Sequence, residues 1–207
     1  MGLFAKRKKT SETPPSFVAD TEARRMIQAY IDYTQEKGGR LDQIASMVLY
    51  TIADFRMPVS EMTPDIEKKY NADIPLFEFG CFWLFLIDYW YSQHKTSSQR
   101  NTDVNAIMDK FTMVFSKIIE PKQANRILND RLQIYSRLLK EPDHLKAQIQ
   151  QLNGLMVSAV ENGSPVIYNN NTPPLNIDAI ENQFMTIAAG EHFKAFFPLQ
   201  TDIFTKF

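Results

Sequence analysis

The chain has 207 residues, of which 44% are hydrophobic and 23% are charged, and its formal net charge is −1. This is the composition of a globular protein with one sizeable core, and the near-neutral charge gives no reason to expect nucleic acid as a partner. With only 7 glycines an all-β fold is disfavoured, and the single cysteine, Cys81, cannot form an internal disulfide. We therefore expect a mostly helical protein in a reducing compartment, which favours the cytoplasm.

Residues 1–16 are predicted to be a flexible basic tail. They contain four consecutive basic residues at 6–9, show no helical period and end close to two prolines. An alternative is weak peripheral contact with an anionic membrane through residues 1–9, in which Leu3 and Phe4 enter the interface while the cations bind phosphate. We expect no signal peptide, because the apolar start is too short and the basic cluster follows it.

Residues 17–197 show the 3.6-residue period of amphipathic helices nearly throughout, so we expect one all-helical domain there. The first two helices are expected at about 18–37 and 41–56, and the short link through Gly38 and Gly39 makes them an antiparallel hairpin. The other predicted helices begin at capping residues or prolines, or end at them. They are 64–71, 73–95, 101–119, 121–140, 142–162 and 175–196.

The helix at 73–95 decides the predicted architecture. From Leu76 to Tyr91 it is apolar or aromatic on nearly every side, and only Glu78 and Asp88 interrupt it with charge. A membrane span is possible on length alone, but there is no second hydrophobic segment and the flanks are not basic. We therefore predict an all-α, single-domain bundle of seven or eight helices around a central, fully buried, aromatic-rich helix at about 74–94.

Two segments are predicted to lack helical structure near the end of the chain. Residues 164–174 are rich in Asn and Pro, and within them Val166, Ile167 and Tyr168 are suited to a short extended contact. Residues 198–207 form an aromatic C-terminal tail with two phenylalanines, which we expect to dock on the body of the protein or on a partner.

Acids in an apolar helix are costly to bury unless they are paired. Glu78 and Asp88 are ten residues apart, which places them about 80° from each other around the helix axis, so they do not form one carboxylate pair. We expect each to pair with a cation or hydroxyl of a neighbouring helix. The candidate partners are Arg131, Arg137, Tyr30, Tyr50 and Tyr135. The alternative is an acid with a raised pKa that faces a pocket.

The aromatic residues of the central helix are interpreted as core packing, because large side chains dominate the energetics of cores. The alternative is that some of them line a cavity for an apolar ligand, as can happen inside helical bundles. The residues proposed for such a ligand pocket are Glu78, Trp83, Phe85, Asp88, Tyr89, Arg131 and Tyr135.

No catalytic residue, metal site or cofactor is predicted. The only Glu-x-x-His pattern, Glu141 to His144, straddles a proline, and His94 and His192 have no spacing that places them with it. Cys81 is expected to be an inert core thiol, and no phosphate-binding loop or nucleophile motif occurs.

These patterns favour a non-enzymatic helical protein that acts through protein–protein contacts, either with a protein partner or as a homodimer. The alternative is a helical-bundle ligand-binding or cofactor-dependent protein with an apolar pocket beside the central helix.

Overall fold

The computed structural model describes residues 22–53, 73–169 and 171, and this part of the chain is a helical bundle without strands. Its six helices are α1 (Glu22–Lys37), α2 (Arg40–Ala53), α4 (Asp73–His94), α5 (Ser97–Val114), α6 (Pro121–Leu138) and α7 (His144–Glu161). The predicted all-α class is thus confirmed for the described residues, with six helices there against the seven or eight predicted for the whole chain. The predictions for the remaining segments lie outside the described residues. These are the tails 1–16 and 198–207 and the helices 64–71 and 175–196.

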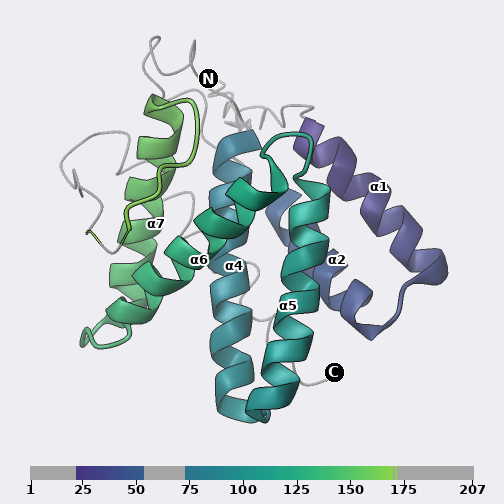
Figure 1. Cartoon of the computed structure of the whole chain (residues 1–207), viewed down its shortest axis with the longest axis horizontal. Helices are drawn as coiled ribbons and strands as arrows, with labels where there is room; N and C mark the ends of the chain where they lie inside the picture. The colour runs from purple at the N-terminus through teal and green to yellow at the C-terminus, as the bar shows by residue number, and fades with distance from the viewer. Residues whose placement is uncertain (1–21, 54–72, 170, 172–207) are drawn as a thin grey trace, which may run out of the picture.

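Helix α4 is the centre of this bundle. It packs against all five other described helices, with the hairpin of α1 and α2 on one side and α7 on the other (Figure 1). Helix α5 runs back beside α4, and α6 crosses from α5 towards α7 (Figure 1). The central position predicted for this helix is therefore correct. None of the described helices combines the length and the apolar character that crossing a membrane requires.

The burial of α4 is not uniform along its length. Every residue from Asp73 to Phe85 is buried, including both glycine and cysteine of that stretch. Beyond Ile87 the helix emerges, so that Tyr89 is 38% exposed and residues 92–94 are exposed. The prediction of full burial over 74–94 is wrong for this end, because α4 continues past its neighbours to the turn into α5 (Figure 1).

Close approach of α5 to α4 depends on Gly80. A Cβ at this position would lie 2.3 Å from Cε2 of Phe111, so a side chain larger than hydrogen does not fit. The ring of Phe111 packs against Phe77 and Phe115, with ring centroids 5.5 Å and 4.7 Å away. Aromatic packing of this kind fills the interface that the glycine opens.

Two helix starts differ from the predicted ones because of capping. Thr96, which lies between the predicted helices 73–95 and 101–119, is the N-cap of α5 and forms a capping box with Gln99. Helix α5 therefore begins at 97 rather than at 101, and it ends at Val114 although the apolar stripe continues to Ile119. Helix α7 begins after its N-cap, Asp143, whose carboxylate accepts the N–H of Lys146. Side-chain acceptors at these positions satisfy the first amides of each helix.

Candidate functional site: a buried charged cluster that holds an irregular segment

The site is built first from an ion pair between α4 and α6. Arg131 donates from Nε to Oε2 of Glu78 at 2.7 Å and from Nη2 to Oε1 at 2.6 Å. Both side chains are 0% exposed. This two-pronged geometry is the strong form of an arginine–carboxylate pair. It confirms the prediction that Glu78 is paired by a cation of a neighbouring helix, with Arg131 as the partner.

A second carboxylate, Asp130, shares the same guanidinium. Nη1 of Arg131 donates to Oδ2 of Asp130 at 2.6 Å, and the Asp130 side chain is only 5% exposed. The cluster thus contains two carboxylates and one guanidinium, which leaves a formal charge of −1 in a buried environment. Such an excess is costly unless further donors compensate it.

The compensating donors come from the backbone of residues 164–169, here called the strap. The strap leaves the end of α7 and runs back beside that helix without regular secondary structure (Figure 1). The N–H of Tyr168 donates to Oδ2 of Asp130 at 3.1 Å, and the N–H of Asn169 donates to Oδ1 at 3.0 Å. Successive amides that converge on one carboxylate form an anion-binding arrangement. Asn169 has φ 49°, in the left-handed region that asparagine tolerates.

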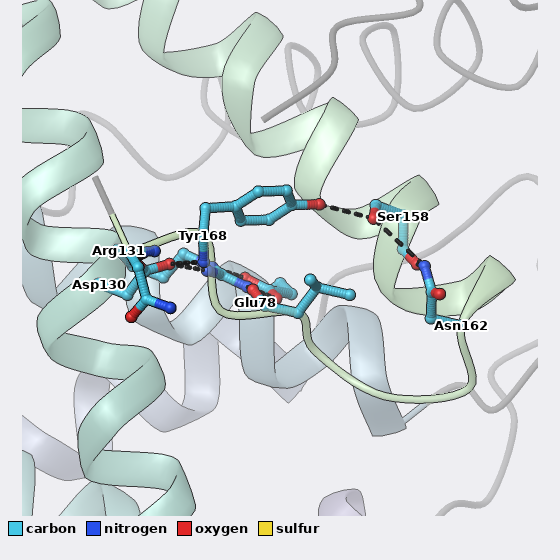
Figure 2. A network of polar contacts seen from close by, with 8 residues as sticks. Glu78, Asp130, Arg131, Ser158, Asn162 and Tyr168 are labelled. Atoms are coloured by element: carbon cyan, nitrogen blue, oxygen red, sulfur yellow. Dashed lines mark hydrogen bonds and ion pairs between the residues drawn. The ribbon is translucent and has the colours of Figure 1, made fainter. Parts of the chain in front are cut away.

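Arg131 also contacts the strap. Its Nη2 donates to the carbonyl of Val166 at 2.9 Å, and its Cζ lies 5.7 Å from the centroid of the Tyr168 ring. The guanidinium therefore holds Glu78, Asp130 and the strap at once. Figure 2 shows these groups meeting between the ribbons of α4 and α6.

The side chain of Tyr168 ties the strap to α7. Its hydroxyl lies 2.7 Å from Oγ of Ser158, in hydrogen-bond contact (Figure 2). Nδ2 of Asn162 donates to the carbonyl of Ser158 at 2.7 Å, next to the helix end from which the strap departs. The strap is thus held at three points, through its backbone by Asp130 and Arg131 and through one aromatic side chain by α7.

The electrostatics of the cluster favour the charged form of Arg131 and the neutral forms of Tyr135 and Cys81. Burial opposes the charge on Arg131, but the attraction of Glu78 prevails and raises the pKa of the guanidinium. Burial, and then the negative charge of Glu78, raise the pKa of Tyr135 and of the Cys81 thiol. At neutral pH both are therefore protonated, and a protonated thiol is a poor nucleophile. This agrees with the interpretation of Cys81 as a core residue.

The proposed pocket residues differ in their burial, although the rings of Phe85 and Tyr89 stack with centroids 6.3 Å apart. Glu78, Arg131 and Tyr135 lie in the buried half of the bundle, where the ring centroids of Phe85 and Tyr135 are 5.3 Å apart. Trp83 is also buried and meets Phe79 edge-on.

Asp88 and Tyr89, by contrast, lie near the exposed end of α4. Arg100 of α5 donates to Asp88 from Nε at 2.7 Å and from Nη2 at 2.6 Å. The cation predicted for Asp88 is present, but it is Arg100, which is none of the candidate partners. Arg100 was missed because the helix that carries it begins four residues earlier than predicted. Whether the seven residues border a ligand pocket remains a prediction.

Two members of the site, Asp130 and the strap backbone, were not found by sequence reasoning. Asp130 precedes Arg131 on an amphipathic helix, where an acid beside a base is typical of a solvated face. Its role depends on two backbone amides, 38 and 39 residues further along the chain. The only sequence signal was the extended contact predicted for Val166–Tyr168.

Those residues considered as metal ligands that lie in the described ranges do not come together. Glu141 and His144 are exposed at the junction of α6 and α7, His94 stacks on Trp90 with ring centroids 4.6 Å apart, and His192 lies outside the described residues. Within the described ranges, no three His, Cys, Asp or Glu side chains gather in a way that could hold a metal ion.

Comparison with known protein families, curated proteins and solved structures gave no match. The site is therefore interpreted from its own chemistry.

Proposed function

We propose that this protein is a non-enzymatic helical protein that acts through protein–protein contacts. The observation that supports this best is that the buried cluster of Glu78, Asp130 and Arg131 binds polypeptide backbone. Each charged group of the cluster is hydrogen-bonded to another member or to a peptide group of the strap. Such an arrangement holds a chain in place, whereas proton transfer requires an acid or base directed at a substrate.

The form that we propose is a cytoplasmic homodimer or a complex with another protein. Size-exclusion chromatography with light scattering, run from about 1 to 100 μM, tests this by comparing the measured mass with the 24.0 kDa of one chain. A mass that rises with concentration, or a stoichiometric second chain in the peak, supports the proposal. A strict monomer over the whole range, purified without a partner, contradicts it.

A second candidate function is the binding of a small apolar ligand beside α4. It is favoured by the hydroxyl of Tyr135, which is buried and has no hydrogen-bond partner among the described residues. The ring centroid of Tyr135 lies 5.0 Å from that of Phe82, so the ring that carries the hydroxyl is packed against another aromatic side chain. Buried hydroxyls usually find a partner, and a ligand acceptor is one way to supply it.

Native mass spectrometry of the purified protein tests this second candidate. A discrete added mass that disappears on denaturation, and is reduced by Tyr135→Phe, supports ligand binding. A bare protein mass after purification under gentle conditions favours the first proposal.

A further inference from the structure

We infer that the cluster of Glu78, Asp130 and Arg131 is a peptide-binding site that the strap occupies in cis, and that the equivalent segment of a partner protein takes the strap's place in trans. This inference deepens the proposed function by assigning one site to the contact. The partner segment is defined by chemistry: irregular backbone with two successive free amides, and an aromatic hydroxyl at the position of Tyr168.

The first argument is that the cluster recognises backbone atoms. Its polar contacts with the strap go to the carbonyl of Val166 and to the amides of Tyr168 and Asn169. These groups are present in any peptide, so another chain with suitable side chains can supply them. Backbone bonds then give affinity, while the few side-chain contacts give selectivity.

The second argument is charge. Two carboxylates share one guanidinium, so the site carries a formal charge of −1 that the two strap amides compensate. An acidic peptide would add to this excess, and a proline at either amide position would remove a required donor. The partner segment therefore has neither an acidic residue nor a proline at the positions of Tyr168 and Asn169.

The third argument concerns what fastens the strap: besides its hydrogen bonds, Pro165 is buried and Ile167 and Tyr168 pack against the core, and a peptide with the same side chains can make the same contacts. The chain turns out of α7 at Gly163, which has φ +66° and open space around the position of its Cβ. Within the strap, Tyr168 supplies the ring over Arg131 and the hydroxyl that meets Ser158. Covalent attachment gives the strap an effective concentration in the millimolar range, so a free peptide competes poorly until the strap is weakened.

The test uses the full chain and a labelled peptide of residues 164–171, Ser-Pro-Val-Ile-Tyr-Asn-Asn-Asn. Tyr168→Ala weakens the strap in cis and leaves the three residues of the cluster intact. We expect fluorescence anisotropy to show the peptide binding at least about tenfold more tightly to Tyr168→Ala than to the unaltered protein, because it competes with a weaker strap. Adding Asp130→Asn to the Tyr168→Ala variant should reverse this gain in affinity for the peptide.

A matched peptide makes the result specific. Methylation of the two backbone nitrogens at the positions of Tyr168 and Asn169 removes both donors and keeps every side chain, so this peptide should not bind. Circular dichroism checks that each variant remains helical, and Ser158→Ala is a milder way to weaken the strap if Tyr168→Ala does not fold. The peptide should also bind Ser158→Ala more tightly than it binds the unaltered protein.

Three results overturn the inference: equal affinity for the unaltered protein and a folded strap variant, equal binding of the methylated peptide, or no binding to either folded strap variant. The outcome of the peptide-binding test can be distinguished from the outcome of the light-scattering test of the proposed function. If light scattering shows an assembly while the peptide fails to bind, contact occurs elsewhere and only this site assignment is wrong. If the chain is a strict monomer while the peptide binds as described, the site assignment stands.

Discussion

Helix α4 carries two acids, and each is held by two hydrogen bonds from an arginine of another helix. The contact distances are the same, 2.7 and 2.6 Å in both pairs. Their surroundings differ. Glu78 and Arg131 are 0% exposed, whereas the side chains of Asp88 and Arg100 are 16% and 39% exposed. Equal geometry therefore coexists with very different access to water.

This difference determines what each pair contributes. When one partner of an exposed pair is removed, water solvates the other, and the loss is small. When one partner of a buried pair is removed, the remaining charge has no solvent, and the loss is several kcal/mol. The buried pair is thus an obligatory part of the bundle core. The exposed pair connects α4 to α5, but its removal should change the free energy of unfolding only slightly.

The largest expected effect comes from removing the buried arginine. Arg131→Met keeps an unbranched side chain of similar length but leaves two carboxylates without their cation. We expect the free energy of unfolding to fall by about 3–5 kcal/mol. Arg100→Met at the other end of α4 is the matched control, with an expected loss of about 0–1 kcal/mol. Urea denaturation followed by circular dichroism measures both, and equal losses would contradict the comparison.

The next effect concerns access of reagents to the buried half of α4. Burial raises the pKa of Cys81, and the thiol lies on the turn that follows Glu78. We expect it to react with a disulfide reagent at about pH 8 at least about a hundredfold more slowly than an exposed cysteine.

Gln93→Cys, on the exposed end of the same helix, supplies that reference. Mass spectrometry of labelled peptides distinguishes the two thiols in one sample. Comparable rates would mean that water and reagent reach the centre of the bundle.

A smaller effect is expected from the packing of α4 on α5. Gly80→Ala places a methyl group against the ring of Phe111, which is itself packed in the core. We expect a loss of about 1–3 kcal/mol from overpacking, reduced in part by the better helix propensity of alanine. Ser92→Ala, near the exposed end, should change stability by less than about 0.5 kcal/mol. Thermal unfolding of the two variants gives the comparison, and a neutral Gly80→Ala would show that the Phe111 ring moves aside freely.

The smallest effect is a pH dependence at a partly exposed ion pair. Hydrogen bonds from Lys110 and, after it, from Tyr30 lower the pKa of Asp42 below its ordinary value of 3.8. A carboxylate with a lowered folded-state pKa stabilises the protein above the unfolded-state pKa, and this contribution is lost as the pH falls through the folded-state value.

Asp42→Asn should therefore cost about 1 kcal/mol or less at about pH 7, and this difference from the unaltered protein should shrink below about pH 4. Denaturant titrations at both pH values measure it. A difference that grows on acidification would have the wrong sign for a lowered pKa.

Much of the bundle follows from local patterns. The stretch from Leu76 to Tyr91 has no polar face on which it could lie against water, and this alone predicts its place in the centre. The need of Glu78 for a cation also follows from the sequence, because an unpaired carboxylate is not tolerated in such surroundings. The ends of helices were less predictable, since Thr96 can close one helix or cap the next, and the choice depends on how the chain turns.

The pairings themselves were decided only by the tertiary structure. Arg131 and Arg137 are equally plausible partners from the sequence, and the packing of α6 on α4 brings the first of them to Glu78. Asp130 has the sequence context of a surface acid, and it becomes part of the core because the strap returns over it with two free amides. Local sequence sets which residues must be buried and which must be paired. The contacts of Arg131 with Glu78 and with the strap span 53 and 35 residues of chain, and no local pattern specifies them.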